Sequence, residues 1–151
     1  MNGKEKSELY AKFKISLKNA KKYEFWLQAI FIEYAMLEDR TESALRHAGG
    51  IKLTNSQGHP LKLSEKLNKL KSNPRFADKK IRKYISLELL DSIGKWKKDR
   101  DTLIHGLMNV SADDEKVKQL AFEGERLVNL LSNRVDSVKR IFEKENDKGE
   151  Q

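Results

Sequence analysis

The sequence predicts an all-α fold. Apolar residues recur at spacings of three and four along most of the chain, and the alternating apolar and polar runs typical of strands are almost absent. The 151 residues are enough for one domain with its own hydrophobic core, and the chain has no cysteine for disulfides or a thiolate metal site. We therefore expect a single helical domain over residues 1–151, a bundle of about five helices with a frayed C-terminal tail.

Residues that start or stop helices divide the chain. Ser7 is the expected N-cap of the first helix, and Gly49 with Gly50 should end the second, because glycine readily takes the left-handed conformation that follows a helix. Ser111 with Asp114 makes a capping-box-like start for the last helix. The composition of the segment after the second helix favours an exposed loop or a short hairpin. The expected helices cover residues 7–21, 23–48, 62–72, 86–105 and 111 to the tail, with the loop at 49–60. The expected core face of the first helix contains Leu9, Phe13, Leu17 and Ala20.

The positive charge is concentrated in one segment. The chain has 31 basic and 23 acidic residues, a net charge of +8, and residues 62–83 contain nine of the basic residues but only two acidic ones. Such a patch suits a polyanion, because neutralised phosphates release condensed counterions. The same pattern also suits lysine-rich helices that are simply well solvated. If the patch binds RNA, the expected contacts are Lys66, Lys69, Arg75, Lys79 and Lys80.

Missing motifs exclude several classes of protein. The sequence has no Gly-rich phosphate loop, no G-x-S-x-G turn and no H-E-x-x-H, and its three histidines are too far apart in sequence for a local metal site. We therefore expect no metal and no cofactor. The longest apolar run, residues 25–37, is shorter than the roughly 20 residues of a membrane span, and no secretory signal follows the charged N-terminus. These features predict a cytoplasmic protein that does not enter a membrane.

The candidate catalytic motif is "RDTLIHG", which contains Arg100 and His105. A polar residue, Asp101, follows the arginine, whereas apolar residues precede the histidine and a glycine follows it. An arginine with a histidine four to six residues beyond it, in a helical domain of this size, resembles the HEPN superfamily.

A second pair, Arg40 and His47, has a similar spacing. We favour the later pair because apolar residues precede its histidine, because an acid directly follows its arginine, and because its helix follows the basic segment. Residues 40–47 instead carry Glu42 and Arg46 at the i,i+4 spacing of a charge pair on a solvated helix face. For the later pair, the alternative is an exposed arginine and a histidine that the helix dipole favours near a C-terminus.

The resemblance implies a metal-independent endoribonuclease, usually a homodimer that brings two Arg/His pairs together in one cleft on RNA. His105 would take a proton from the 2′-hydroxyl or give one to the leaving 5′-oxygen, and Arg100 would stabilise charge on the phosphate. Asp101 would orient either side chain, or would simply be an exposed acid. Lys97 and Lys98 would contact phosphates, although surface lysines beside a buried tryptophan are also common. The product would be a 2′,3′-cyclic phosphate, and DNA would resist cleavage.

Many relatives of this kind act in toxin or abortive-infection systems, so an antitoxin or another defence-system partner is a further expectation. HEPN toxins paired with a nucleotidyltransferase antitoxin carry a tyrosine two residues past the histidine, whereas Leu107 stands there in this chain, which puts that regulation in doubt. Two non-catalytic interpretations stay open. One is a HEPN-like helical module that binds nucleic acid or a protein partner, and the other is a helical adaptor whose last helix pairs with another chain.

Overall fold

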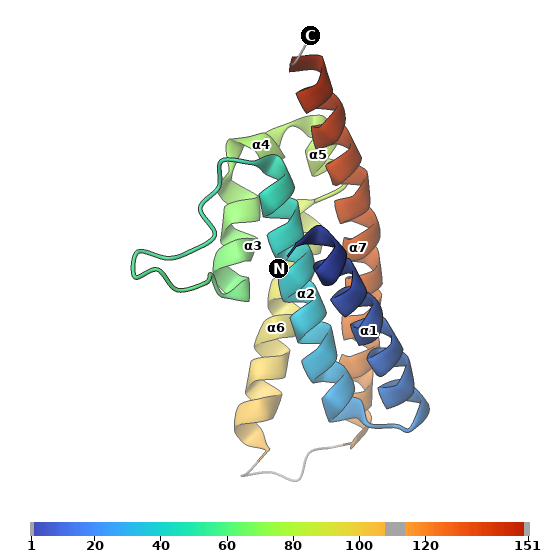
Figure 1. Ribbon diagram of the computed structural model, residues 1–151. Helices are drawn as coiled ribbons and strands as arrows, with labels where there is room; N and C mark the ends of the chain where they lie inside the picture. The colour runs from blue at the N-terminus through green and yellow to red at the C-terminus, as the bar shows by residue number, and fades with distance from the viewer. Residues whose placement is uncertain (1, 108–113, 150–151) are drawn as a thin grey trace. The chain divides into compact units, whose positions relative to one another are not determined.

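The expected all-α class is confirmed. The computed structural model describes residues 2–107 and 114–149, and these residues form helices and no strand (Figure 1). Two four-residue helices, α4 and α5, add to the five that the sequence predicts. None of the described helices has an apolar stretch long enough to cross a membrane. The helices are α1 Gly3–Lys22, α2 Trp26–Ala48, α3 Leu63–Ser72, α4 Pro74–Ala77, α5 Lys79–Arg82, α6 Leu87–Gly106 and α7 Asp114–Gly149.

The start of α1 differs from the prediction, because Asn2 and not Ser7 is the N-cap. The side-chain oxygen of Asn2 accepts a hydrogen bond from the Glu5 backbone N–H at 2.9 Å, and the Glu5 carboxylate accepts one from the Asn2 N–H at 2.9 Å. This reciprocal capping box satisfies two backbone donors at once, whereas Ser7 has no acid three residues on. The helix therefore begins at Gly3.

The buried face of α1 is shorter than expected. Leu17 and Ala20 are buried and Phe13 is half-buried, but Leu9 is 40% exposed, so its assignment to the core is wrong. Apolar spacing identifies one face of a helix, but it does not determine how much of that face other helices cover.

The end of α2 agrees better with the sequence. α2 ends at Ala48, and Gly49 and Gly50 have φ of 74° and 67°, in the left-handed region where glycine avoids strain. The last helix differs from the expectation, because α7 continues to Gly149 through most of the tail that was expected to fray. The capping pair that should start α7, Ser111 with Asp114, lies outside the residues whose side chains the structure describes.

The chain divides into two compact units. Unit 1 consists of Met1–Met36 and Trp96–Arg126, and therefore holds α1 with parts of α2, α6 and α7. Within it the buried indole of Trp96 on α6 donates from Nε1 to the Leu120 carbonyl oxygen of α7 at 2.9 Å. The core of unit 1 contains Leu17, Ala20, Ala29, Ile30, Met36, Trp96, Val117 and Ala121.

Unit 2 consists of Leu37–Lys95 and Leu127–Gln151 and holds α3, α4 and α5 with the remaining parts of the long helices. Phe76 on α4 meets Phe142 on α7 edge to face, with ring centres 5.8 Å apart. The core of unit 2 contains Leu37, Leu45, Leu63, Leu70, Phe76, Ile85, Leu90, Leu131, Val138 and Phe142.

The loop between α2 and α3 extends away from the helices of unit 2 (Figure 1). An isolated antiparallel bridge joins Thr54 to Pro60, and the Asn55 side chain accepts hydrogen bonds from the backbone N–H groups of Gln57 and His59 at 2.9 and 3.0 Å. The loop is therefore a short hairpin-like turn, one of the two forms that its composition predicts.

Candidate active site

Arg100 is held against an aromatic surface of α2. Its guanidinium carbon lies 4.0 Å from the ring centre of Tyr34 and 5.5 Å from that of Phe31, one helical turn away. Trp96, one turn earlier on α6, is 2% exposed, so Arg100 shares the inward face of α6 and its side chain is only 17% exposed. Cation–π contacts with these rings therefore orient the guanidinium.

Asp101 joins two cations of α6. Its carboxylate accepts a hydrogen bond from Arg100 at 2.9 Å and one from Lys97 at 2.6 Å. Burial by itself would raise the pKa of Asp101, but the hydrogen bonds and charges of Lys97 and Arg100 outweigh it and hold that pKa below its usual value. Asp101 is therefore an ionised acceptor at neutral pH. The sequence left open whether Asp101 contacts Arg100 or His105, and the described contacts join it to Arg100.

One donor of Arg100 is unused. Its Nε atom is buried and has no hydrogen-bond partner in the part of the chain that the structure describes. A buried donor without a partner costs free energy, so Arg100 is held in this position at a cost.

His105 lies in the last turn of α6 and is exposed. A step of five residues turns an ideal helix by about 140° from Arg100, so the two side chains point in different directions. Among the described residues, the contacts of Arg100 go to Tyr34, Phe31 and Asp101 rather than to His105.

Two of the expected RNA contacts, Lys66 and Arg75 of unit 2, are engaged by the protein. Lys66 is 5% exposed and its ammonium donates to the Glu38 carbonyl oxygen at 3.3 Å. Arg75 donates to the carbonyl oxygen of Ala48, the last residue of α2, and its guanidinium lies 4.8 Å from the ring centre of Phe142. Both side chains therefore join helices of unit 2.

The other expected RNA contacts differ in exposure. Lys79 and Lys80 are exposed on α5 and Lys69 is half-buried on α3, all in unit 2. Lys98 is exposed on α6 in unit 1, where the motif also lies, whereas Lys97 beside it is paired with Asp101.

The second Arg/His pair lies on α2 within unit 2. Arg40 donates two hydrogen bonds to its neighbour Asp39, at 2.6 and 3.0 Å. Arg46 pairs with Glu42 at 3.3 Å, as the i,i+4 spacing predicts.

His47 of that pair sits in a cationic environment. Burial lowers its pKa below the ordinary value, and Lys139, Arg40 and Arg46 lower it further, while Glu143 opposes them. His47 is therefore neutral at physiological pH.

The motif and the charge pattern do not identify the stretch "FIEY" of α2, in which Phe31 and Tyr34 contact Arg100 and Glu33 lies between them in sequence. Glu33 is completely buried, and a Cβ built on Gly124 of α7 would come within 2.3 Å of its carboxylate. Burial raises the pKa of Glu33 to about 9, Glu125 adds to the rise and Lys21 opposes it. The sequence does contain a signal that could have pointed to this stretch: an acid, Glu33, stands inside an apolar helical run between two aromatic residues three positions apart.

No group of three histidine, aspartate or glutamate side chains in the described ranges could hold a metal ion. No family model, no curated protein and no solved structure matches this chain. A function must therefore be inferred from the chemistry of its own residues.

Proposed function

We propose that this protein is a metal-independent endoribonuclease of the HEPN type, in which Arg100 and His105 are the catalytic residues. The observation that carries the proposal is the state of Arg100: its guanidinium is held against Tyr34 and bonded to Asp101, while its buried Nε has no partner among the described residues. A guanidinium that is fixed and still partly exposed suits phosphate oxygens, which accept hydrogen bonds in its planar geometry. The exposed imidazole of His105, on the same helix, supplies a group that accepts and donates protons.

The proposed reaction is an in-line transesterification. The RNA 2′-oxygen attacks the adjacent phosphorus, the bond from phosphorus to the 5′-oxygen of the next nucleotide breaks, and the products are a 2′,3′-cyclic phosphate and a 5′-hydroxyl. One imidazole takes the proton of the 2′-hydroxyl and another gives a proton to the leaving oxygen. Arg100 stabilises the charge that develops on the non-bridging phosphate oxygens. DNA lacks the attacking hydroxyl and is not a substrate.

A homodimer supplies the second imidazole. Because Arg100 and His105 point in directions about 140° apart on α6, one chain does not readily surround a phosphate with both. A two-fold axis beside the end of α6 places two arginines and two histidines in one cleft.

The RNA contacts that we propose are the exposed Lys79 and Lys80 and the half-buried Lys69 in unit 2, and the exposed Lys98 in unit 1. Lys66 and Arg75 are omitted because backbone carbonyl oxygens engage them, and Lys97 because it pairs with Asp101. A nuclease of this kind would suit a toxin or abortive-infection system, with an antitoxin as its partner. Growth arrest when the protein is expressed would support that role.

The test is cleavage of single-stranded and structured RNA in EDTA. We expect Arg100→Ala and His105→Ala each to lower the rate at least 100-fold, since general acid–base catalysis contributes about 10²–10⁴-fold. Arg126→Ala and His59→Ala are matched controls at exposed positions and should keep the wild-type rate. Cleavage that persists in both motif variants, or that only Arg40→Ala or His47→Ala removes, would show that the site lies elsewhere.

The alternative is a non-catalytic helical module that binds nucleic acid or a protein partner. It is favoured by the fact that Arg100, Asp101 and Lys97 form an ion-pair network that would stabilise the end of α6 without any chemistry. A pure dimer that binds RNA in the same assay but leaves it intact would support this alternative.

A further inference from the structure

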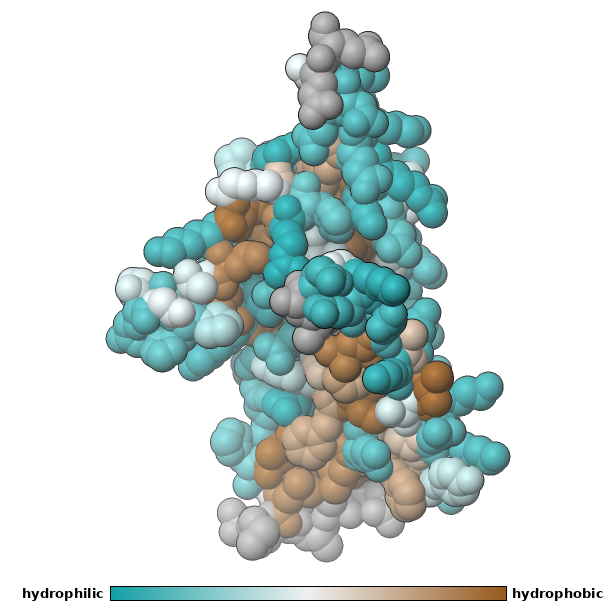
Figure 2. Space-filling view, in the orientation of Figure 1, coloured by the Kyte–Doolittle hydropathy of each residue, from teal (hydrophilic) through white to brown (hydrophobic). Residues whose placement is uncertain are grey.

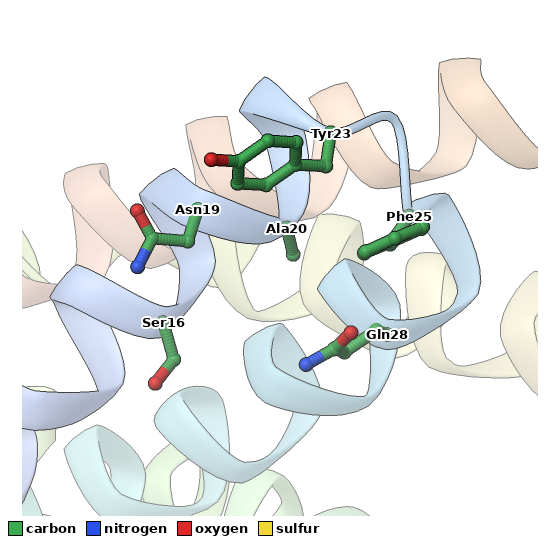
Figure 3. A pocket seen from close by; sticks show the side chains of 6 residues that line it. All are labelled: Ser16, Asn19, Ala20, Tyr23, Phe25 and Gln28. Carbon is green, nitrogen blue, oxygen red and sulfur yellow. The ribbon is translucent and has the colours of Figure 1, made fainter.

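A hollow in unit 1 lies at the turn between α1 and α2. It is lined by Ser16, Asn19, Ala20, Tyr23, Phe25 and Gln28 and holds about 210 Å³. Pockets for drug-sized ligands hold roughly 300–1,000 Å³, so this one suits a single ring system. Figure 3 shows the Phe25 ring and the Gln28 amide on one side of Ala20, with Asn19 and Ser16 on the α1 side.

Two aromatic side chains reach solvent at this hollow. Tyr23 is 61% exposed and Phe25 is 57% exposed, and their ring centres lie 6.2 Å apart with planes tilted by 32°. Most of the large apolar side chains that are exposed in the described residues belong to unit 1, and Figure 2 shows apolar surface there among polar side chains. A flat ring that covered Tyr23 and Phe25 would remove this surface from water.

The backbone of the turn that carries both rings is strained. Glu24 between them has φ of 58°, a conformation that costs a non-glycine residue free energy, and the Phe25 N–H donates to the Ala20 carbonyl oxygen at 2.8 Å. The strained turn therefore fixes the backbone positions from which the two rings project relative to the end of α1.

Polar groups and charge around the rings indicate the ligand. The amides of Asn19 and Gln28 and the hydroxyl of Ser16 are exposed, and together they offer donors and acceptors to the edge of a planar heterocycle. The Lys22 ammonium lies 5.6 Å from the ring centre of Tyr23, and α1 carries seven lysines but two glutamates. Aromatic faces for stacking, amides for a base edge and lysines for phosphate are the parts with which proteins bind unpaired nucleic acid.

We propose that this hollow binds one unpaired nucleobase of an RNA strand, with the base stacked on Tyr23 or Phe25 and the adjoining phosphate beside Lys22. The inference rests on the proposed function in taking RNA as the ligand, but it does not require that the protein cleaves RNA.

The experiment measures binding by fluorescence anisotropy in the His105→Ala background, with a labelled 12-nucleotide single-stranded RNA and a blunt duplex of the same strand as probes. Tyr23→Ala/Phe25→Ala should weaken binding of the single strand about tenfold or more and leave duplex binding within twofold, because stacking needs an exposed base face. Tyr23→Phe/Phe25→Tyr keeps both rings and should bind as the parent does. Ile15→Ala removes an apolar side chain that is 63% exposed on α1 but does not line the hollow, and it should also bind as the parent does.

Equal losses for single strand and duplex, or no loss for either, would overturn the proposal. A change in sedimenting mass of the double alanine variant would also overturn it, because the rings would then belong to an interface between copies of the chain. If wild-type protein binds single-stranded RNA through the rings but does not cleave it, the proposed nuclease activity fails and the base site stands.

Discussion

At the scale of single residues, Glu33 is unusual because its carboxyl group is buried and its pKa is strongly raised. Its carboxyl oxygens are buried and have no hydrogen-bond partner among the described residues, and burial raises its pKa to about 9 from an ordinary 4.5. Glu33 is therefore protonated in the folded protein at neutral pH and ionised in the unfolded chain. Between these two pKa values the folded state binds more protons, so stability is greatest in acid and falls as the pH rises toward 9.

Glu33→Gln should remove this pH dependence. The free energy of unfolding of the wild type should fall relative to the variant by about 1.4 kcal/mol per pH unit between about pH 5 and pH 9, so the variant is the more stable protein at pH 8. Urea unfolding at pH 6 and pH 8 measures the difference. Glu8→Gln, at an exposed glutamate of α1, is the control and should follow the wild type. Parallel curves for wild type and Glu33→Gln would show that Glu33 is ionised in the folded state.

At the scale of helices, Gly124 determines how α7 packs within unit 1. Glycine in the middle of a helix is unfavourable by roughly 1 kcal/mol compared with alanine, so its presence needs a reason. A Cβ at this position would come 2.3 Å from Oε1 of Glu33 and 2.7 Å from Cζ2 of Trp96. The missing side chain therefore creates the space that the buried acid occupies.

Gly124→Ala should destabilise the protein by roughly 1–3 kcal/mol despite the better helix propensity of alanine, because the added methyl group overpacks the core. Gly94→Ala is the matched control, since Gly94 lies inside α6 with open space at its Cβ position, and that variant should gain up to about 1 kcal/mol. Thermal unfolding measures both changes: the melting temperature should fall for Gly124→Ala and rise for Gly94→Ala. A stabilised Gly124→Ala would mean that Glu33 and Trp96 move aside at no cost.

A second prediction at the scale of helices concerns the stability of the turn between α1 and α2. Glu24 has φ of 58°, so Glu24→Gly should raise the stability by about 1 kcal/mol through relief of backbone strain. Glu24→Ala keeps the strain and separates the loss of the carboxylate from the change in backbone. Equal melting temperatures for the glycine and alanine variants would argue against strain at this position.

At the scale of the whole molecule, the proposed chemistry depends on two chains. If Arg100 and His105 of both copies surround one phosphate, a mixed dimer of Arg100→Ala and His105→Ala chains keeps one arginine and one histidine in the cleft. Because the mixed dimer has one imidazole where the proposed reaction uses two, mixing the two inactive proteins should raise RNA cleavage above that of either variant alone but well below the wild-type rate, to an extent that follows the fraction of mixed dimer. The control is each variant alone at the total protein concentration of the mixture. Absence of recovery, while sedimentation shows that subunits exchange, would contradict the shared cleft.

Part of this molecule could be predicted because it depends on neighbours in sequence. The helical class, the end of α2 at Gly49 and Gly50 and the i,i+4 pair of Glu42 with Arg46 all follow from local spacing and local backbone preference. The capping of α1 is also local, but the prediction of Ser7 did not take account of the capping box that Asn2 forms with Glu5.

The sequence by itself determined that the chain is helical, that α2 ends before Gly49, and that one segment concentrates the basic residues. Only the tertiary structure decided that Arg100 lies on the Tyr34 ring, that Lys66 is buried and donates to a carbonyl oxygen, and that Glu33 fills the space left by Gly124. The physical reason is that periodicity assigns a residue to a face of its helix, whereas burial, pKa and hydrogen-bond partners depend on the helix that covers this face.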